Sequence, residues 1–189
     1  MNDTAREPQD EDDPVMAEVA AETTQSVVAF AGHPIHAMLV HFPIALTMTV
    51  LGADLLYWWN GDPFWVRAAI WMVGLGFLSG ALAGLAGLME ILAVPGIRTR
   101  VGSWSHGVAG LMLISLLGLN WGFRFQGGDV MPVGILLSLL SAIVAGAAGW
   151  HGGKLIFHHG VGLIQNEETE ARETAPTGRR DAEAADREA

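Results

Sequence analysis

The chain has 189 residues, of which 51% are hydrophobic, and its formal net charge is −10 at pH 7. This hydrophobic fraction, together with 24 glycines, indicates a membrane protein. The chain has no cysteine, which excludes disulfides, thiolate-bound metals, cysteine-bound iron–sulfur clusters and covalently attached haem.

The negative charge belongs to the two ends of the chain. The first 22 residues hold eight acids against one Arg, and residues 165–189 hold eight acids against four Arg. These segments have few large apolar residues, so they cannot bury enough surface to offset chain entropy. We therefore predict a disordered acidic tail over residues 1–30 and another over residues 165–189. The N-terminus also lacks the basic and apolar regions of a cleavable signal peptide.

Four apolar segments lie between the tails, in a predicted domain of residues 31–164. They cover residues 37–59, 67–92, 104–125 and 132–157. Each is near the roughly 20 residues that a helix needs to cross a bilayer, and none alternates as a membrane β-strand does. Short connections with Gly, Asp and Pro separate them. The predicted fold is all-α, a four-transmembrane-helix bundle in up-down-up-down order.

Basic residues near the segment ends predict how the bundle is oriented. One side has Arg98, Arg100, Lys154 and Arg172, and the other has Arg67 and Arg124. Cytoplasmic loops of membrane proteins are enriched in Lys and Arg. We therefore expect a multi-pass protein of the inner (plasma) membrane with both termini in the cytoplasm.

Histidines gather at three places along the chain. The stretch GHPIHAMLVHFPIAL, which begins at Gly32, holds three of them, a fourth begins the third segment, and the rest end the last segment: His33, His36, His41, His106, His151, His158 and His159. In an up-down-up-down bundle these three places lie on the same membrane face. Glu90, at the end of the second segment, joins them there.

Imidazole is a common ligand of transition metals and haem iron, and its second ring nitrogen needs an acceptor such as Glu90. We expect His41 and His106 to project into the bundle at similar depth as an axial pair. The candidate cofactor ligands are His41, His106, His36 and His159, and the candidate metal ligands are His33, His36, His41, His106 and Glu90. Histidines at membrane interfaces also bond carbonyls, water and headgroups, so a structural role stays open for each.

Two further patterns predict contacts between helices. Small residues at four-residue spacing offer faces for close packing: Gly76, Gly80 and Gly84 in the second segment, and Gly149 and Gly153 in the fourth. Asp54 lies about 20 Å from His41 along a helix axis, near the opposite surface. We expect Asp54 to form an interhelical hydrogen bond with Asn120 rather than to relay protons.

The opening histidine stretch with Asp54, and the later GGKLIFHHGVGL, resemble the membrane-protein family called domain of unknown function 2231, over residues 32–164. The family pattern falls on His33, Pro34, His36, His41, Pro43, Asp54, Glu90, His106, Gly152, Gly153 and His159. Ala37 departs from it where the family often repeats proline, and Glu90 stands where Asp is expected. The resemblance implies an association with Rieske-type iron–sulfur domains, and hence membrane electron transfer.

Three interpretations of function remain open. The first is binding of haem b or a transition metal for electron transfer in the bilayer, with quinone or a redox protein as partner. The second is a structural or accessory subunit of a membrane complex without a cofactor. The third is a small transporter or metal-handling protein, for which the hydroxyls within the segments give a weak path: Thr47, Ser79, Ser115, Ser138 and Ser141.

Some classes of function find no support in the sequence. There is no nucleophile–base pair, phosphate loop or nucleic-acid surface. We therefore expect a protein that is not an enzyme on its own and has no nucleic-acid partner. Homo-oligomers and hetero-oligomers are both compatible with the sequence.

Overall fold

The structure is a computed structural model that describes residues 26–31, 33–159 and 161. Most of both predicted tails, residues 1–25 and 162–189, lies outside the described residues. The elements, in chain order, are β1 (Ala29–Phe30), β2 (His33–Pro34), α2 (Ile35–Leu39), α3 (His41–Asn60), α4 (Pro63–Ala93), α5 (Pro95–Arg98), α6 (Val101–Phe125), the π-helical turn η1 (Val130–Gly134) and α7 (Ile135–His159).

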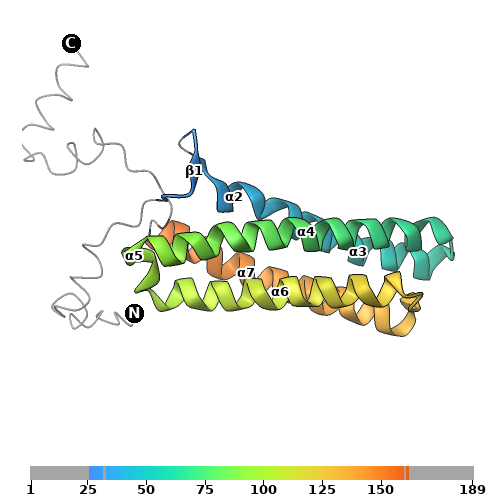
Figure 1. Cartoon of the computed structure of the whole chain (residues 1–189). Coiled ribbons are helices and arrows are strands. Elements are labelled where there is room, and N and C mark those ends of the chain that lie inside the picture. Colours follow the sequence, from blue (N-terminus) through green and yellow to red (C-terminus); the bar gives the residue numbers. More distant parts are fainter. Residues whose placement is uncertain (1–25, 32, 160, 162–189) are drawn as a thin grey trace, which may run out of the picture.

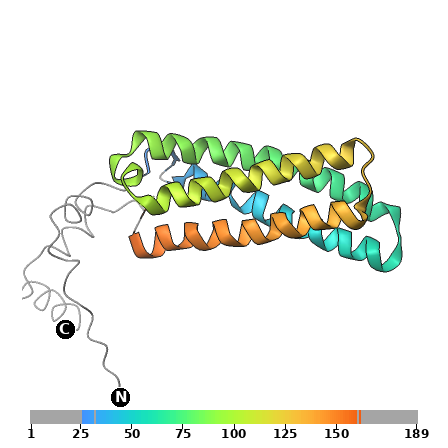
Figure 2. The ribbon, with the colours of Figure 1, turned by 90° about the horizontal axis from the view of Figure 1, so that it is seen from below.

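The long helices α3, α4, α6 and α7 lie side by side as a bundle in which consecutive helices run in opposite directions (Figures 1 and 2). Four stretches are long and apolar enough to cross a membrane: Ile35–Asn60, Pro63–Ala93, Val101–Phe125 and Val130–Phe157. Helix α3 packs against α4 and α7, and α6 packs against the same two helices. The predicted four-helix, up-down-up-down bundle is confirmed.

The helix boundaries differ from the prediction where local capping decides them. Helix α4 begins at Pro63, earlier than expected, because the Asp62 side chain accepts a hydrogen bond from the Phe64 amide at 2.8 Å and proline suits the first helical position. The preceding helix ends at Gly61, whose φ of 69° is a left-handed conformation. A short helix, α5, occupies the connection that was predicted as a loop.

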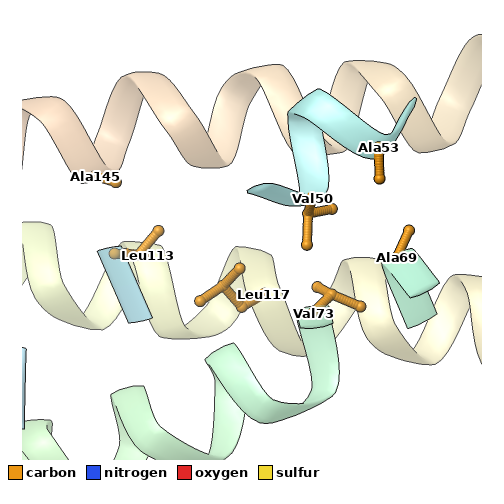
Figure 3. Packing of buried hydrophobic residues seen from close by; sticks show 7 residues of the cluster. All are labelled: Val50, Ala53, Ala69, Val73, Leu113, Leu117 and Ala145. Atoms are coloured by element: carbon orange, nitrogen blue, oxygen red, sulfur yellow. The ribbon is translucent and has the colours of Figure 1, made fainter. Parts of the chain in front are cut away.

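The interior of the bundle is lined by small side chains, while large ones face outward. The buried cluster consists of Val50, Ala53, Ala69, Val73, Leu113, Leu117 and Ala145, which point between the helices in Figure 3. Trp71 and Leu119 are 74% and 60% exposed. Large apolar side chains on the outside suit contact with lipid, and small residues inside let the helices approach closely.

The glycines of α4 do serve helix contact, as predicted. A Cβ at Gly76 would lie 3.5 Å from the Leu46 Cβ of α3, and a Cβ at Gly84 would lie 2.9 Å from the Ile114 Cδ1 of α6. A Cβ at Gly149 of α7 would meet nothing within 4 Å. The glycine face of α4 therefore packs inside the bundle, whereas Gly149 makes no such contact within the described chain.

A buried ion pair joins α3 and α6 at the end of the bundle where α3 ends and α4 begins. Arg124 donates from Nη1 to Oδ1 of Asp54 at 2.9 Å and from Nη2 to Oδ2 at 2.6 Å. The Arg124 Nε donates to Oδ1 of Asn120 at 2.7 Å, and Nη2 donates to the Ser138 hydroxyl at 3.0 Å. All four side chains are buried. The pairing of Arg124 with Asp54 is therefore bidentate, and Asn120 and Ser138 accept further hydrogen bonds from the guanidinium.

This network changes two sequence-based expectations. Asp54 and Asn120 were predicted to bond to each other, whereas Arg124 lies between them and bonds to both. Arg124 was also expected at the membrane surface, where it would help to set orientation. It is buried instead, because its guanidinium turns inward onto the Asp54 carboxylate.

Replacing Asp54 with Ala should lower the free energy of unfolding by about 3–5 kcal/mol, because it leaves the Arg124 charge buried without a counterion. Replacing both residues with Leu should cost much less than the single change, since no charge is then stranded. Denaturant unfolding in detergent, followed by circular dichroism, measures both. Asp129→Ala is the control, because that side chain is exposed; equal losses for Asp54→Ala and Asp129→Ala would contradict the prediction.

Candidate functional site

The described histidine side chains lie at one end of the bundle, as the topology predicted. His33, His36 and His41 precede or begin α3, His106 lies in the second turn of α6, and His151 lies near the end of α7. Helix α7 ends at His159, and the side chains of His158 and His159 are outside the described residues. The candidate site is therefore built at the end where α2, α5 and the last turns of α7 meet (Figure 1).

A small hairpin leads into this end of the bundle. Strands β1 and β2 pair antiparallel, with Phe30 opposite His33, and the Ile35 amide donates to the Val28 carbonyl at 3.0 Å. Residues 26–30, the described part of the predicted N-terminal tail, thus pack against the domain. The hairpin fixes where α2 starts, and α2 in turn packs against α4.

Glu90, in the last turn of α4, holds the hairpin in place. Its carboxylate accepts hydrogen bonds from the Val28 amide at 2.8 Å, from the Val27 amide at 3.2 Å and from the Ser26 hydroxyl. Glu90 was expected to accept a bond from a histidine ring. The structure gives it backbone donors instead, because the hairpin crosses the end of α4 and brings its amides to the carboxylate.

His36 is seated on α4, which means that its ring packs on the backbone of that helix. Its Nδ1 lies 2.7 Å from the carbonyl oxygen of Ala83. The ring lies against Gly87, one turn further along, where an added Cβ would be 2.8 Å from Nδ1. A side chain on residue 87 would therefore collide with the imidazole, and glycine at this position makes room for the ring.

His106 is seated on α7 in the same way. Its Nδ1 lies 3.1 Å from the carbonyl oxygen of Ala148, and a Cβ on Gly152 would be 3.0 Å from its Cε1. In both cases an alanine supplies the carbonyl and the glycine four residues later makes room for the ring. The Ala-x-x-x-Gly spacing was present in the sequence, but nothing there shows which alanine carbonyl meets which histidine.

The two seated rings meet at the centre of this end of the bundle. The ring centroids of His36 and His106 are 5.8 Å apart, and the ring planes are 83° apart. Because a carbonyl oxygen only accepts, each Nδ1 carries the proton, which leaves a lone pair on each Nε2 of the neutral rings. No partner for either Nε2 is found in the described part of the chain.

The structure therefore differs from the sequence analysis in which histidine faces His106. His41 is exposed, and its Nδ1 lies 3.3 Å from the carbonyl oxygen of Met38. His36 and His41 are five residues apart, which is about 140° around a helix of 3.6 residues per turn, so His36 faces inward and His41 outward. His33 is exposed beside the carbonyl of Ala31.

The five residues predicted as metal ligands do not form a cluster. Among residues 26–31, 33–159 and 161, no group of three or more His, Asp, Glu or Cys side chains is placed to hold a metal ion. His33 and His41 are exposed, and Glu90 holds the hairpin. Of the predicted set, only His36 and His106 come together.

The two halves of the bundle repeat one arrangement that the sequence analysis did not find. Asp54 follows His36 by 18 residues, and Arg124 follows His106 by 18 residues. The histidines face one another at one end, and the Asp and Arg side chains form the ion pair at the other. The first half supplies His36 and Asp54 from its first membrane span, and its second span, α4, holds the His36 ring. The second half supplies His106 and Arg124 from α6, and α7 holds the His106 ring.

Gly152→Ala should lower the melting temperature in detergent and displace the His106 ring, because the new Cβ would lie 3.0 Å from Cε1. Gly149→Ala is the matched control on the same helix. It should leave the melting temperature unchanged or raise it, since the position is open and Ala favours helix by about 1 kcal/mol over Gly. Equal effects of the two substitutions would show that the His106 ring does not occupy this seat.

Glu90→Gln should release the hairpin from α4. Gln keeps one neutral acceptor oxygen, but its amide nitrogen is a donor, so it cannot replace both carboxylate oxygens that accept from the Val27 and Val28 amides. Exchange of these two amides with deuterium, measured by NMR in nanodiscs, should accelerate about tenfold or more, as expected for loss of a charged hydrogen bond. Asp129→Asn, at the other end of the bundle, should leave exchange unchanged; protection retained in Glu90→Gln would contradict the anchoring role.

Comparison with known proteins places the chain in a family. Residues 32–165 match the family described as "Predicted membrane protein (DUF2231)". No curated protein matches the chain, and no solved structure matches it. The match covers the bundle, both seated histidines and the ion pair. The chain therefore belongs to the membrane-protein family DUF2231.

Proposed function

We propose that this protein binds a transition-metal ion between the Nε2 atoms of His36 and His106 and uses it for electron transfer at the membrane. The observation that carries the proposal is the pair of seated rings: each Nδ1–H is bound to a carbonyl, and neither Nε2 lone pair has a partner among the residues that the structure describes. Metal-binding histidines typically donate their other ring N–H in this way, which fixes the ring orientation.

The spacing of the two rings suits one shared ion. With metal–nitrogen bonds of roughly 2.0–2.1 Å, two imidazoles on one ion have centroids about 5–6.5 Å apart, depending on the angle at the metal. The observed 5.8 Å falls within this interval. Imidazole nitrogen suits Cu, Zn, Ni and Fe, and copper is bound most tightly of the divalent ions. A redox function therefore favours copper.

A single ion fits the site better than haem b, the other cofactor considered from the sequence. A bis-histidine haem places a porphyrin between the two rings. Here the His36 ring is packed on α4 and the His106 ring on α7, where an added Cβ would lie 2.8 Å from the first ring at Gly87 and 3.0 Å from the second at Gly152. Neither ring can retreat toward its helix to admit a macrocycle.

The location of the site supports a role at one face of the inner membrane. The site lies at the end of the bundle, so an electron donor or acceptor such as a quinone or a redox protein can approach it from the interface. Arg98 and Lys154 are exposed at the same end, whereas Arg67 is exposed at the other and Arg124 is buried. This balance supports a cytoplasmic location for the histidine end.

A structural role is the second candidate, and the same hydrogen bonds favour it. His36 ties α2 to α4 and His106 ties α6 to α7, which stabilises the bundle even without a cofactor. A transporter gains no support, because Thr47, Ser79, Ser115, Ser138 and Ser141 all donate to carbonyls of their own helices.

The test is metal analysis of the full-length protein purified in mild detergent, with absorption spectra before and after dithionite reduction. Copper-loaded protein should hold about one ion per chain, and His36→Ala and His106→Ala should each lower affinity for the ion by tenfold or more, as expected for loss of one ligand. His41→Ala and His151→Ala should leave the stoichiometry unchanged, because both rings are exposed.

Other outcomes of this test would support one of the alternative functions. A Soret band in the purified protein, lost in both His36→Ala and His106→Ala, would replace the single ion with haem b. Absence of any metal or pigment that depends on these two residues, combined with lower melting temperatures of the variants, would leave the structural role.

A further inference from the structure

The β1–β2 hairpin presents apolar side chains that the bundle does not cover. Residues 27–31, with the sequence VVAFA, carry no polar side chain, and Val27 and Phe30 are 63% and 74% exposed. The hairpin lies beside the last turns of α4, whereas α5 lies farther toward the end of the bundle (Figure 1). The hairpin also stands out sideways from the bundle in this view, so its apolar side chains point into the surroundings of the helices.

Glu90 sets the depth of the hairpin in the membrane. Its carboxylate binds the Val27 and Val28 amides, and it lies three residues before the end of α4, which is about 4.5 Å along the helix axis. Helix α4 has 31 residues and is therefore about 46 Å long, whereas the hydrocarbon core is about 30 Å thick and the whole bilayer about 40–45 Å. For a helix centred in the bilayer, Glu90 lies in the headgroup layer, close to its boundary with the acyl chains.

The surface of α4 around this level is itself apolar and uncovered. Leu88, Met89 and Leu92 are exposed, as large apolar side chains are along the outside of the whole bundle. Val27 and Phe30 extend this lipid-facing surface sideways from the helix. Water rarely borders a large contiguous apolar surface of a protein, whereas lipid contacts it at no cost. Lipid is therefore the partner that fits the exposed side of the hairpin.

Side chains supply hydrogen bonds to the backbone of the hairpin. The Glu90 carboxylate accepts from the amides of Val27 and Val28, and the His33 ring donates from Nδ1 to the carbonyl oxygen of Ala31 at 2.9 Å. A backbone polar group costs free energy wherever water is scarce, unless the protein supplies its partner. These bonds at both ends of β1 thus suit a hairpin that lies at the edge of the hydrocarbon rather than in bulk water.

We infer that the β1–β2 hairpin is an interfacial membrane anchor, in which Val27 and Phe30 insert into the boundary between lipid headgroups and acyl chains. Interfacial helices bury their apolar faces about 5–10 Å into this boundary, and the same driving force acts on an apolar hairpin. The Glu90 carboxylate holds the anchor on α4, and lipid covers its outer side. The segment that leads into the first membrane span is thus held at the membrane surface, independently of any metal bound by the histidines.

The test uses spin labels on single-cysteine variants of the full-length protein in liposomes, which is direct because the chain has no cysteine of its own. Electron paramagnetic resonance measures how often each label collides with oxygen, which enters lipid, and with a water-soluble nickel complex. Asp129→Cys is the water control and Leu92→Cys the lipid control, since both side chains are exposed. Labels at Val27→Cys and Phe30→Cys should have oxygen-to-nickel collision ratios about threefold or more above that of Asp129→Cys, because the boundary layer excludes the complex.

Two results would overturn the inference. A Phe30→Cys label with the same ratio as Asp129→Cys would place the hairpin in water. A label that collides with neither reagent, and whose spectrum is broadened by a second label, would show that another copy of the chain covers the hairpin. Glu90→Gln in the Phe30→Cys background should lower the ratio toward that of Asp129→Cys, because the bonds that set the depth are weakened; an unchanged ratio would overturn the role of Glu90 in setting that depth.

Discussion

The hydrogen bond from an imidazole to a carbonyl inside another helix is the constraint on which the histidine end of the bundle depends. Such a carbonyl already accepts the N–H four residues later, and it takes the imidazole N–H with its second lone pair. The ring must then lie flat along the helix, which only glycine at the next turn permits. Gly87 and Gly152 meet this requirement, and the result is two rings with fixed tautomers and fixed orientation.

The polar groups of the bundle are concentrated at its two ends, with small apolar side chains between them. At one end His36 joins α2 to α4, His106 joins α6 to α7 and Glu90 holds the hairpin on α4; at the other, Arg124 joins Asp54, Asn120 and Ser138. A buried charge without a partner is costly, so the ion pair strongly disfavours other placements of α3 relative to α6. This fixed packing also keeps His36 and His106 at the same depth.

The fold followed from the sequence because its signals are local: the length of each apolar segment, and the Gly, Asp and Pro residues between segments. The histidine end followed from the same topology. The choice of His36 over His41 did not, because it depends on which face of the first span packs against α4, and contacts between helices decide that. Arg124 was placed at the surface because an arginine near a segment end normally lies there, and its carboxylate partner is 70 residues away in sequence. The role of Glu90 likewise depends on the Val27 and Val28 amides, which are 63 and 62 residues away in sequence.

The 18-residue spacings from His36 to Asp54 and from His106 to Arg124 have a consequence for how the two halves of the bundle, α2–α4 and α6–α7, pair with each other. If two copies of the first half associated, Asp54 would meet Asp54, and two copies of the second half would bring Arg124 against Arg124. Either pairing would bury like charges in an apolar interior, whereas the mixed pairing neutralises them. Self-association of either half is thus penalised, and pairing of a first half with a second half is favoured. The pair of facing histidines is for this reason assembled from one ring of each half.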